Sequence, residues 1–320
     1  MDTSDCDMKS KPQPLVSVVL PTHNRGSILR VSLSSVLAQT YGNMEILLID
    51  DASSDNTRNV VEGLNDNRVI YHRLKRNMGP GGARNVGISI AQGEFVFFQD
   101  SDDIWLPEKV ERQLTAYYLF AEQKRNVIGG FCRFIKIGNR VTSVIPKDEN
   151  LHRFGGHFHE PLLRGNLIGT PTLMVESTVL RKIGGFDECL STLEDWDLAL
   201  RLSREGLLAF TNDILMCSLS SNAGVNSRPS GRSLLRLIKN SESSFRRHKR
   251  LHSMCLRSAA LQFIKSGERD EGIATAKMAF RANWSLRGLA ISVCPSAYLT
   301  VRNLMLMVRN LMRERGRRKS

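Results

Sequence analysis

An acidic cluster directly follows a strongly apolar segment near residue 100. The segment Glu94–Phe98 is expected to form a strand, and it leads into Gln99-Asp-Ser-Asp-Asp103. Two carboxylates spaced by one residue at the end of a strand can hold a hard divalent cation while that cation bridges the phosphates of a ligand. Aspartate is also frequent in solvated turns, and for an isolated pair the turn is the commoner explanation. The apolar strand before this pair indicates a central position in a sheet, which favours a ligand site.

Polar residues also follow two neighbouring strands of the predicted sheet. Thr22–Asn24 come after the apolar segment Leu15–Leu20, which Pro21 is expected to stop, and Asp50-Asp51 ends the next apolar segment. Because ligands of open α/β sheets bind beyond the carboxyl ends of the strands, these groups are expected to converge at one edge. Several carboxylates at one edge repel one another unless a cation or hydrogen-bond donors compensate.

A third acidic pair, Glu194-Asp195, opens a predicted helix over Trp196–Arg204. Acidic residues in a first helical turn interact favourably with the helix dipole. By spacing alone, that structural explanation is sufficient for this pair.

Apolar runs and amphipathic stretches alternate through the first hundred residues. This alternation predicts right-handed crossovers and a mostly parallel sheet covered by helices on both faces. Strands are expected over Leu15–Leu20, Glu45–Asp50, Val69–Arg73 and Glu94–Phe98, and later near Val127–Ile137 and Leu173–Val175; helices are expected over Ile28–Gln39, Thr57–Leu64 and Ala83–Ala91, and near Glu108–Ala121.

Charge divides the chain into a nearly neutral body and a basic remainder. Of 45 Lys and Arg and 32 Asp and Glu, residues 227–320 hold 21 basic and only 5 acidic side chains. A loop rich in Ser, Asn, Gly and Pro precedes this remainder. We therefore expect a polar segment 1–14, an α/β domain 15–226 and a basic helical region 227–320.

Several classes of protein are disfavoured by composition. Hydrophobic residues make up 41% of the chain, which excludes wholesale disorder. No uninterrupted apolar run is long enough for a spanning helix, and the acidic N-terminus is unlike a signal peptide. The six cysteines form no CxxC pair, so neither a disulfide framework nor a zinc site is expected, and a reducing cytoplasm fits best.

Six motifs in this order resemble those of family 2 glycosyltransferases of the GT-A fold. The resemblance covers roughly residues 15–215 and implies a Rossmann-like α/β sheet. The motifs are Val16-Ser-Val-Val-Leu-Pro-Thr-His-Asn-Arg25, Ser35-Val-Leu-Ala-Gln-Thr-Tyr41, Ile49-Asp-Asp-Ala-Ser-Ser-Asp-Asn-Thr57, Gly82-Ala-Arg-Asn-Val-Gly87, Gln99-Asp-Ser-Asp-Asp103 and Leu193-Glu-Asp-Trp-Asp-Leu-Ala-Leu-Arg201.

The resemblance assigns a nucleotide pocket to the first strand ends. Asp51 matches the carboxylate that accepts a hydrogen bond from N3–H of a uracil-type base, and Pro21, Thr22 and His23 line the same pocket. Many relatives carry Tyr where His23 stands, so the stacking partner differs here, and His23 is alternatively a strand-end residue without a ligand. Asp100 matches the position that faces the ribose hydroxyls.

The resemblance also implies a divalent cation. Asp102 matches the principal ligand of Mg²⁺ or Mn²⁺, with the diphosphate completing the shell, and Asp103 either adds an outer hydrogen bond or caps a helix. Arg84 resembles a recurrent feature of the nucleotide side, where it either reaches phosphate or base or pairs with Asp50 and Asp51. Its position interrupts GxGxxG, which argues against a dinucleotide site.

The family match selects Asp195 as the general base that takes the proton from an acceptor hydroxyl. Single displacement inverts the anomeric centre and needs no enzyme nucleophile. The QxxRW motif of processive members is missing, which favours transfer of one sugar per encounter.

An amphipathic pattern near the C-terminus predicts a helix with an apolar stripe edged by arginine. Such a helix suits an anionic membrane surface, here through residues 299–320, but it equally suits packing on its own domain. Nucleic acid is not an expected partner, because the tail lacks aromatic platforms. The stripe comprises Val301, Leu304, Met305, Val308, Leu311 and Met312.

Together these features predict an inverting, metal-dependent glycosyltransferase that uses a UDP- or dTDP-sugar. The expected acceptor is a saccharide or a lipid-linked molecule in surface polysaccharide or glycolipid synthesis, with the enzyme in the cytoplasm or peripheral on the inner face of the plasma membrane. The alternative is a catalytically silent protein of the same fold that binds nucleotide or glycan. Nothing in the chain names the donor sugar.

Overall fold

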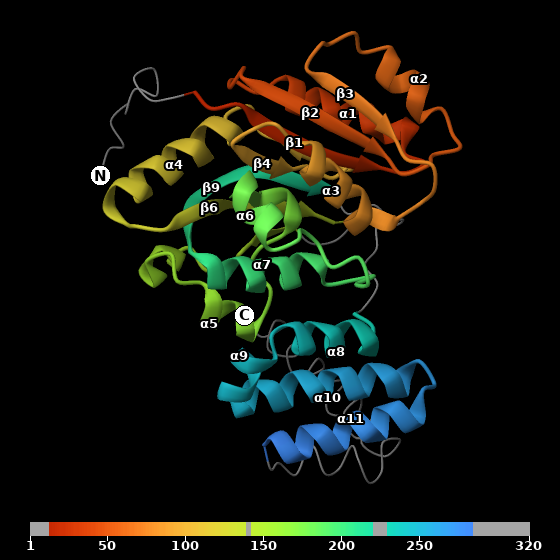
Figure 1. The fold of residues 1–320 in the computed structure, drawn as a ribbon, viewed down its shortest axis with the longest axis vertical. Helices are drawn as coiled ribbons and strands as arrows, with labels where there is room; N and C mark the ends of the chain where they lie inside the picture. The colour runs from red at the N-terminus through yellow and green to blue at the C-terminus, as the bar shows by residue number, and fades with distance from the viewer. Residues whose placement is uncertain (1–12, 139–141, 220–228, 284–320) are drawn as a thin grey trace, which may run out of the picture. The chain divides into compact units, whose positions relative to one another are not determined.

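A computed structural model describes residues 13–138, 142–219 and 229–283. The chain divides into two compact units, the first reaching Asn226 and the second beginning at Ser227 (Figure 1). Positions 1–12 of the predicted segment 1–14 lie outside the described residues. The predicted tail helix over 299–320 lies outside them entirely.

The first unit is built on one mixed sheet. Its first four strands are parallel and lie in the order β3-β2-β1-β4, and within the described residues five further strands complete the sheet. β8 is antiparallel to both β4 and β6, β9 is parallel to β6, and β5 and β7 pair antiparallel with β9 and β6. The strands are β1 Val16–Thr22, β2 Met44–Asp50, β3 Val69–Arg73, β4 Phe95–Phe98, β5 Asp103–Trp105, β6 Val127–Ile137, β7 Thr142–Ile145, β8 Leu173–Glu176 and β9 Leu207–Leu219.

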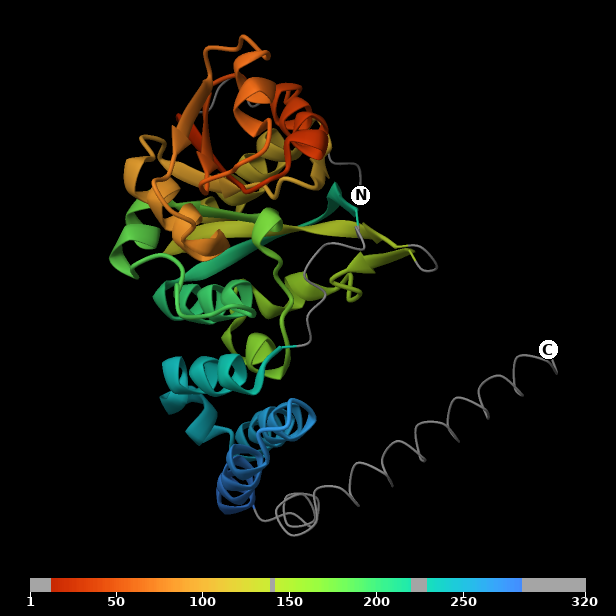
Figure 2. The ribbon, with the colours of Figure 1, turned by 90° about the vertical axis from the view of Figure 1, so that its right-hand side faces the viewer.

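Helices cover both faces of this sheet. α1 and α4 pack against the face that carries Val18, Leu20 and Phe97, whereas α3 packs on the opposite face of β1 (Figure 2). β1 and β2 are therefore buried at every position, as expected for central strands between two helix layers. The helices are α1 Gly26–Leu37, α2 Thr57–Glu62, α3 Gly79–Ile90, α4 Lys109–Gln123, α5 His159–Arg164, α6 Ser177–Lys182 and α7 Glu194–Glu205.

The α/β prediction is confirmed, with two corrections of detail. The run of parallel neighbours ends with β4, because the strand–helix alternation on which that expectation rested also ends there. Among the described strands beyond β4, β6 and β9 alone pair in parallel. Pro21 does not stop β1, which continues to Thr22. β4 pairs with β1 only as far as Val19. Pro21 therefore lies beyond the hydrogen bonds between β1 and β4, where a residue without an N–H is tolerated.

Gly87 sets the approach of α3 to β1 and provides a test of this packing. A Cβ at Gly87 would lie 2.4 Å from Val19 Cγ1, whereas a Cβ at Gly63, at the end of α2, would come no closer than 3.4 Å to Asn59 O. Both Gly→Ala changes restrict the unfolded chain to the same extent. The difference between the two variants in free energy of unfolding therefore reports the clash at Gly87. We expect Gly87→Ala to be about 1–3 kcal/mol less stable than Gly63→Ala in urea unfolding. Equal stabilities would mean that α3 is not in close contact with β1.

The second unit is helical throughout its described part, which confirms the predicted C-terminal helices. It comprises α8 Gly231–Asn240, α9 Glu242–Arg247, α10 Lys249–Lys265 and α11 Arg269–Ala282. α10 and α11 form a hairpin whose contact is built from Ala260, Leu261 and Ala276. In the part of the chain that the structure describes, no helix combines the length and the apolar character needed to cross a bilayer.

Candidate functional site

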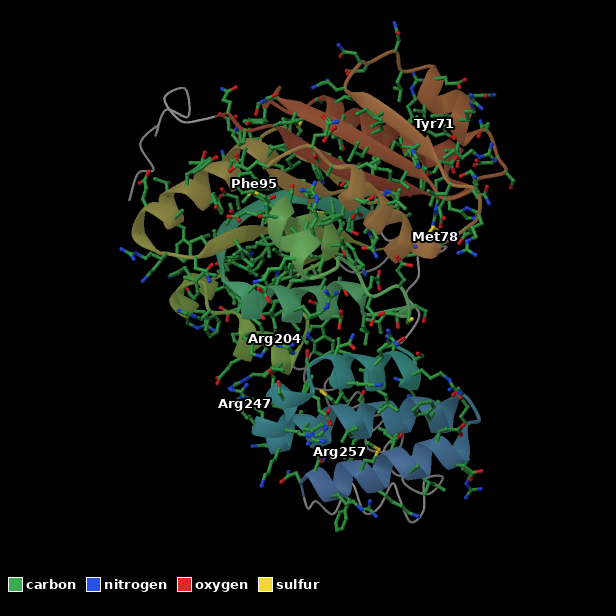
Figure 3. The ribbon with its side chains drawn as sticks, in the orientation of Figure 1. Tyr71, Met78, Phe95, Arg204, Arg247 and Arg257 are labelled. Atoms are coloured by element: carbon green, nitrogen blue, oxygen red, sulfur yellow. The ribbon has the colours of Figure 1, made fainter. Side chains whose placement is uncertain are left out.

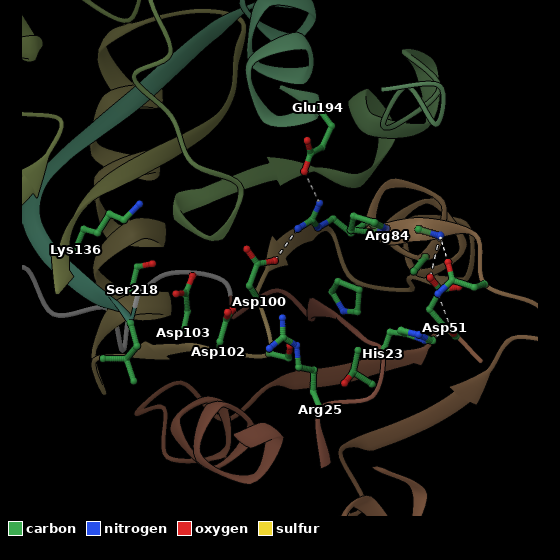
Figure 4. A pocket seen from close by; sticks show the side chains of 18 residues that line it. His23, Arg25, Asp51, Arg84, Asp100, Asp102, Asp103, Lys136, Glu194 and Ser218 are labelled. Carbon is green, nitrogen blue, oxygen red and sulfur yellow. Dashed lines mark hydrogen bonds and ion pairs between the residues drawn. The ribbon is translucent and has the colours of Figure 1, made fainter. Parts of the chain in front are cut away.

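A cavity of about 530 Å³ lies beyond the carboxyl ends of β1, β2 and β4 (Figure 4). This is the edge at which polar residues were expected to converge. Its wall includes nine residues singled out in the sequence, namely Pro21, Thr22, His23, Asp51, Arg84, Asp100, Asp102, Asp103 and Glu194.

Asp51 fixes one side of this cavity. Its two carboxylate oxygens accept the backbone N–H groups of Met78, at 2.6 Å, and Gly79, at 2.8 Å, at the start of α3. A carboxylate has about four acceptor positions, so Asp51 keeps capacity for a further donor. Asp50, by contrast, is occupied within the fold, where its carboxylate accepts bonds from Tyr71 Oη and from Ser53 N.

The imidazole of His23 is held in one orientation. Nδ1 lies 2.7 Å from the carbonyl oxygen of Asp51, and Nε2 lies 3.0 Å from Asn24 Nδ2. Because a carbonyl only accepts, Nδ1 is the nitrogen that donates to Asp51. His23 therefore presents a ring of fixed orientation to the cavity.

Arg84 joins two acidic groups that are far apart in the sequence. From α3, its Nη2 donates to Asp100 at 2.7 Å and its Nη1 to Glu194 at 3.5 Å, and the guanidinium lies 5.2 Å from the ring centre of Phe186. The side chain is buried. Arg84 therefore pairs with the acids that follow β4 and begin α7, and not with Asp50 or Asp51 as one sequence alternative proposed.

Negative charge is crowded at the far end of the cavity. Burial, and then the neighbouring Asp100 carboxylate, raise the pKa of Asp102 and raise that of Asp103 to about 8. Asp103 begins β5 and pairs across to Ser218, so it does not cap a helix, and α4 begins six residues later. A divalent cation would relieve this crowding.

The donor set suits a small oxygen-preferring cation. Asp100, Asp102 and Thr22 line the cavity, and Thr22 Oγ1 is buried without a hydrogen-bond partner among the described residues. No cluster of three or more His, Cys, Asp or Glu with metal-site geometry occurs in residues 13–138, 142–219 and 229–283. The geometry therefore fits a cation held by one or two carboxylates together with ligand phosphates, which is the usual arrangement for Mg²⁺.

Asp195 lies beside this cavity but is not part of its wall, whereas its neighbour Glu194 is. Oδ1 accepts the N–H of Trp196 at 2.7 Å, and Oδ2 accepts Asn166 Nδ2 at 2.8 Å. Burial, and then the Glu194 carboxylate, raise the pKa of Asp195 to about 6. The side chain is thus an oriented carboxylate with a pKa close to neutral, which suits proton transfer.

The local backbone explains why two adjacent acids point to different places. Leu193, immediately before α7, has a positive φ of 70°, a conformation that costs a non-glycine residue about 1 kcal/mol or more. This turn starts α7 at Glu194, so that Glu194 meets Arg84 while Asp195 meets Asn166.

Sequence reasoning missed several residues at this site. Arg25, Lys136 and Ser218 line the cavity and Asn166 orients Asp195. Only Arg25 carries a local signal, because it ends the motif after the first strand; Lys136 and Ser218 reach the site from β6 and β9.

Lys109, the first residue of α4, was also missed, and its side chain is fully buried. Nζ donates to Gln113 Oε1 at 2.6 Å and lies 4.3 Å and 4.9 Å from the ring centres of Trp105 and Phe97. Burial lowers the pKa of Lys109 to about 8. These two rings flank the acidic segment on either side in the sequence, so the ammonium helps to hold its ends together.

The fold and the cavity define an α/β protein with a polar cavity beyond the strand ends of its sheet. Residues 17–169 match glycosyl transferase family 2. Over 204 residues the chain is 32% identical to the UDP-Glc:alpha-D-GlcNAc-diphosphoundecaprenol beta-1,3-glucosyltransferase WfgD of Escherichia coli, covering 64% of this chain and 76% of that protein. The chain therefore belongs to glycosyl transferase family 2.

Some other relatives are longer than this chain. An uncharacterized glycosyltransferase of Rickettsia felis is 33% identical over 213 residues, which cover 64% of this chain and 34% of that protein. The chain thus spans only about a third of the length of that relative.

Solved structures agree with the fold. Staphylococcal (S. aureus) TarS 1-349 in complex with UDP-GlcNAc superimposes with a TM-score of 0.64 at 19% identity, covering 83% of this chain and 81% of that one. The mannosyltransferase PcManGT of Pyrobaculum calidifontis, in complex with GDP-Man and Mn2+, gives a TM-score of 0.52 at 16% identity, covering 93% and 81%. These similarities confirm the GT-A fold that the motifs predicted.

Proposed function

We propose that this chain is an inverting glycosyltransferase that moves one sugar from a nucleoside diphosphate sugar to a hydroxyl of a saccharide or lipid-linked acceptor. The observation that carries the proposal is the cavity in which Asp51, Asp100 and Asp102 converge beside Asp195. UDP or dTDP is the proposed carrier, a choice supported by the UDP-linked sugars named for WfgD and for the TarS complex.

The nucleotide would lie along the first strand ends. The unused acceptor capacity of Asp51 suits the N3–H of a uracil or thymine ring, and Pro21, Thr22 and His23 would surround that ring. Asp100 would accept the ribose hydroxyls. Since the guanidinium of Arg84 already bonds to Asp100, its proposed part is to orient that carboxylate.

Asp102 would hold Mn²⁺ or Mg²⁺ together with the diphosphate of the donor. When bound, such a cation neutralises negative charge on the leaving diphosphate. The crowding of Asp100, Asp102 and Asp103 supports this assignment, as does the presence of Mn2+ with the sugar nucleotide in PcManGT.

Asp195 would act as the general base. As the acceptor oxygen bonds to the anomeric carbon, Asp195 takes the hydroxyl proton, the bond between that carbon and the diphosphate oxygen breaks, and the nucleoside diphosphate leaves with the electron pair. Attack from the face opposite the leaving group inverts the centre. Asn166 and Trp196 N–H orient the accepting carboxylate.

The raised pKa of Asp195 predicts the pH dependence of turnover. With a pKa of about 6, the Asp195 side chain is mostly ionised above pH 6 and can accept a proton. Below pH 6 it is mostly protonated and cannot act as the base. At saturating donor, acceptor and Mn²⁺, kcat at pH 5 is expected to be about one tenth of its plateau above pH 7. Asn166→Ala removes a bond to the ionised form and should move the midpoint to higher pH. A flat profile from pH 5 to 7 would contradict the assignment.

Calorimetric titration of UDP, dTDP and GDP, each with and without Mn²⁺, tests the proposal as a whole. We expect UDP or dTDP to bind, and to bind tightly only with the metal. Binding of GDP alone would reassign the base specificity of the pocket. Binding of no nucleotide under any condition would reject the transferase proposal in favour of a silent protein of the same fold.

The proposed setting is cell-surface polysaccharide or glycolipid synthesis at the cytoplasmic face of the membrane. It is supported by the diphosphoundecaprenol acceptor named for WfgD.

A further inference from the structure

The helical unit contains a second cavity, whose residues have no part in the proposed transfer reaction. It has a volume of about 770 Å³ and is lined by residues of α8, α9, α10 and α11. Figure 1 shows the course of these four helices. Leu235, Ile238, Leu256 and Met278 make up its apolar surface, and Met278 is 49% exposed. We call this cavity the helical groove.

Cations surround the helical groove. Lys239, Lys249 and Arg281 line it, and none of the three side chains has an ion-pair partner within the described parts of the chain. The fourth lining cation, Arg246, pairs at 2.7 Å with Glu242, the only acidic side chain in the described lining. The groove therefore combines an apolar interior with about three uncompensated positive charges.

The whole helical unit has the same sign of charge. Residues 229–283 contain 12 Lys and Arg and 4 Asp and Glu, and Figure 3 marks two of the basic side chains, Arg247 and Arg257. Anionic surfaces attract such a unit, with about 1 kcal/mol gained for each Lys or Arg near an anionic bilayer.

The apolar interior and the uncompensated positive charges of the helical groove together restrict which molecules can occupy it. A free phosphate or a nucleic acid would leave the apolar interior unused, and the described lining contains no Trp, Tyr or Phe on which a base could stack. A second copy of this unit, or the basic segment 299–320, would bring further positive charge to the groove. An amphiphile with an anionic head group matches both features, because its apolar chain suits the interior and its head group suits the cations.

We propose that the helical groove binds an anionic membrane lipid, with an acyl chain against Leu235, Ile238 and Met278 and the phosphate among Lys239, Lys249 and Arg281. This attachment does not depend on the transferase proposal, and it is separate from any contribution of residues 299–320. It would hold the helical unit at the surface of an anionic bilayer.

The apolar half is tested with two matched methionines in the full chain. Met278 lines the groove at 49% exposure, whereas Met254, on α10, is 48% exposed and outside it. In flotation with phosphatidylcholine–phosphatidylglycerol vesicles, Met278→Asp should weaken binding at least tenfold, because a carboxylate opposes insertion into lipid. Met254→Asp adds the same charge and should weaken it far less.

The cationic half is tested with two adjacent side chains of α10. Lys249 lines the groove and Arg250 does not, and both are exposed. Lys249→Gln should weaken vesicle binding about fivefold, the equivalent of one lost charge at the bilayer, and Arg250→Gln should weaken it clearly less. Circular dichroism melting of all four variants controls for folding.

Three results would overturn the proposal. If each groove variant lost no more vesicle affinity than its matched control, the general surface charge of the unit, and not the groove, would bind the vesicle. A change of oligomeric state in Met278→Asp with unchanged vesicle binding would assign the groove to a second copy of the chain. Vesicle binding that is lost on deletion of 299–320 and unchanged by Met278→Asp and Lys249→Gln would assign the attachment to that segment and not to the groove.

Discussion

Asp195→Asn is expected to lower turnover by roughly a hundred- to ten-thousandfold while nucleotide affinity stays unchanged. The amide keeps the size of the carboxylate but no longer takes a proton from the acceptor hydroxyl. Nucleotide binding should persist because Asp195 is not part of the cavity wall in which Asp51 and Asp100 lie. The measurement is kcat at pH 7.5 alongside calorimetric binding of the nucleotide with Mn²⁺.

Glu194→Gln is the matched control for this change. It removes one negative charge from the adjacent position but leaves the proposed base in place, so we expect the loss of turnover to be much smaller. Because the Glu194 carboxylate raises the pKa of Asp195, its removal should also move the midpoint of the pH profile downward. Turnover retained in Asp195→Asn, or an equal loss in both variants, would remove Asp195 from the role of base.

Asp102→Ala is expected to abolish the contribution of Mn²⁺ to nucleotide binding. Without the carboxylate, the cation loses its principal protein ligand, so affinity in Mn²⁺ should fall at least tenfold, to the value measured without metal. Affinity in the absence of metal should change little, or even rise, because a negative charge near the diphosphate is removed. Calorimetry with and without Mn²⁺ separates the two effects.

Asp103→Asn is the control for Asp102→Ala. Asp103 lies in the same acidic segment, but as the first residue of β5 it pairs with Ser218. We therefore expect Asp103→Asn to keep most of the metal dependence. An undiminished response of Asp102→Ala to Mn²⁺ would exclude Asp102 as the metal ligand, and the same loss in both variants would indicate a general effect of charge.

Much of the first half of the fold was predictable from the sequence, because its signals are local. β3 has the predicted bounds, and β2 and β4 differ from theirs by one residue. β9 was missed: Thr211, Asn212 and Asp213 interrupt its apolar pattern, and its pairing with β6 contains register shifts. A strand with a polar interruption and shifts of register lacks the regular alternation of apolar residues from which strands are predicted.

The sequence by itself determined which residues stand at the strand ends, since a parallel α/β sheet brings those ends to one edge whatever the rest of the chain does. His23, Asp51, Asp100 and Asp102 meet at one cavity for this reason. Only the tertiary structure decided the partners of these groups. Arg84 contacts Glu194 across 110 positions of sequence, and Asn166 contacts Asp195 across 29. Such contacts depend on how α7 and the loop before β8 pack on the sheet, a sum of many weak interactions that leaves no pattern in the residues themselves.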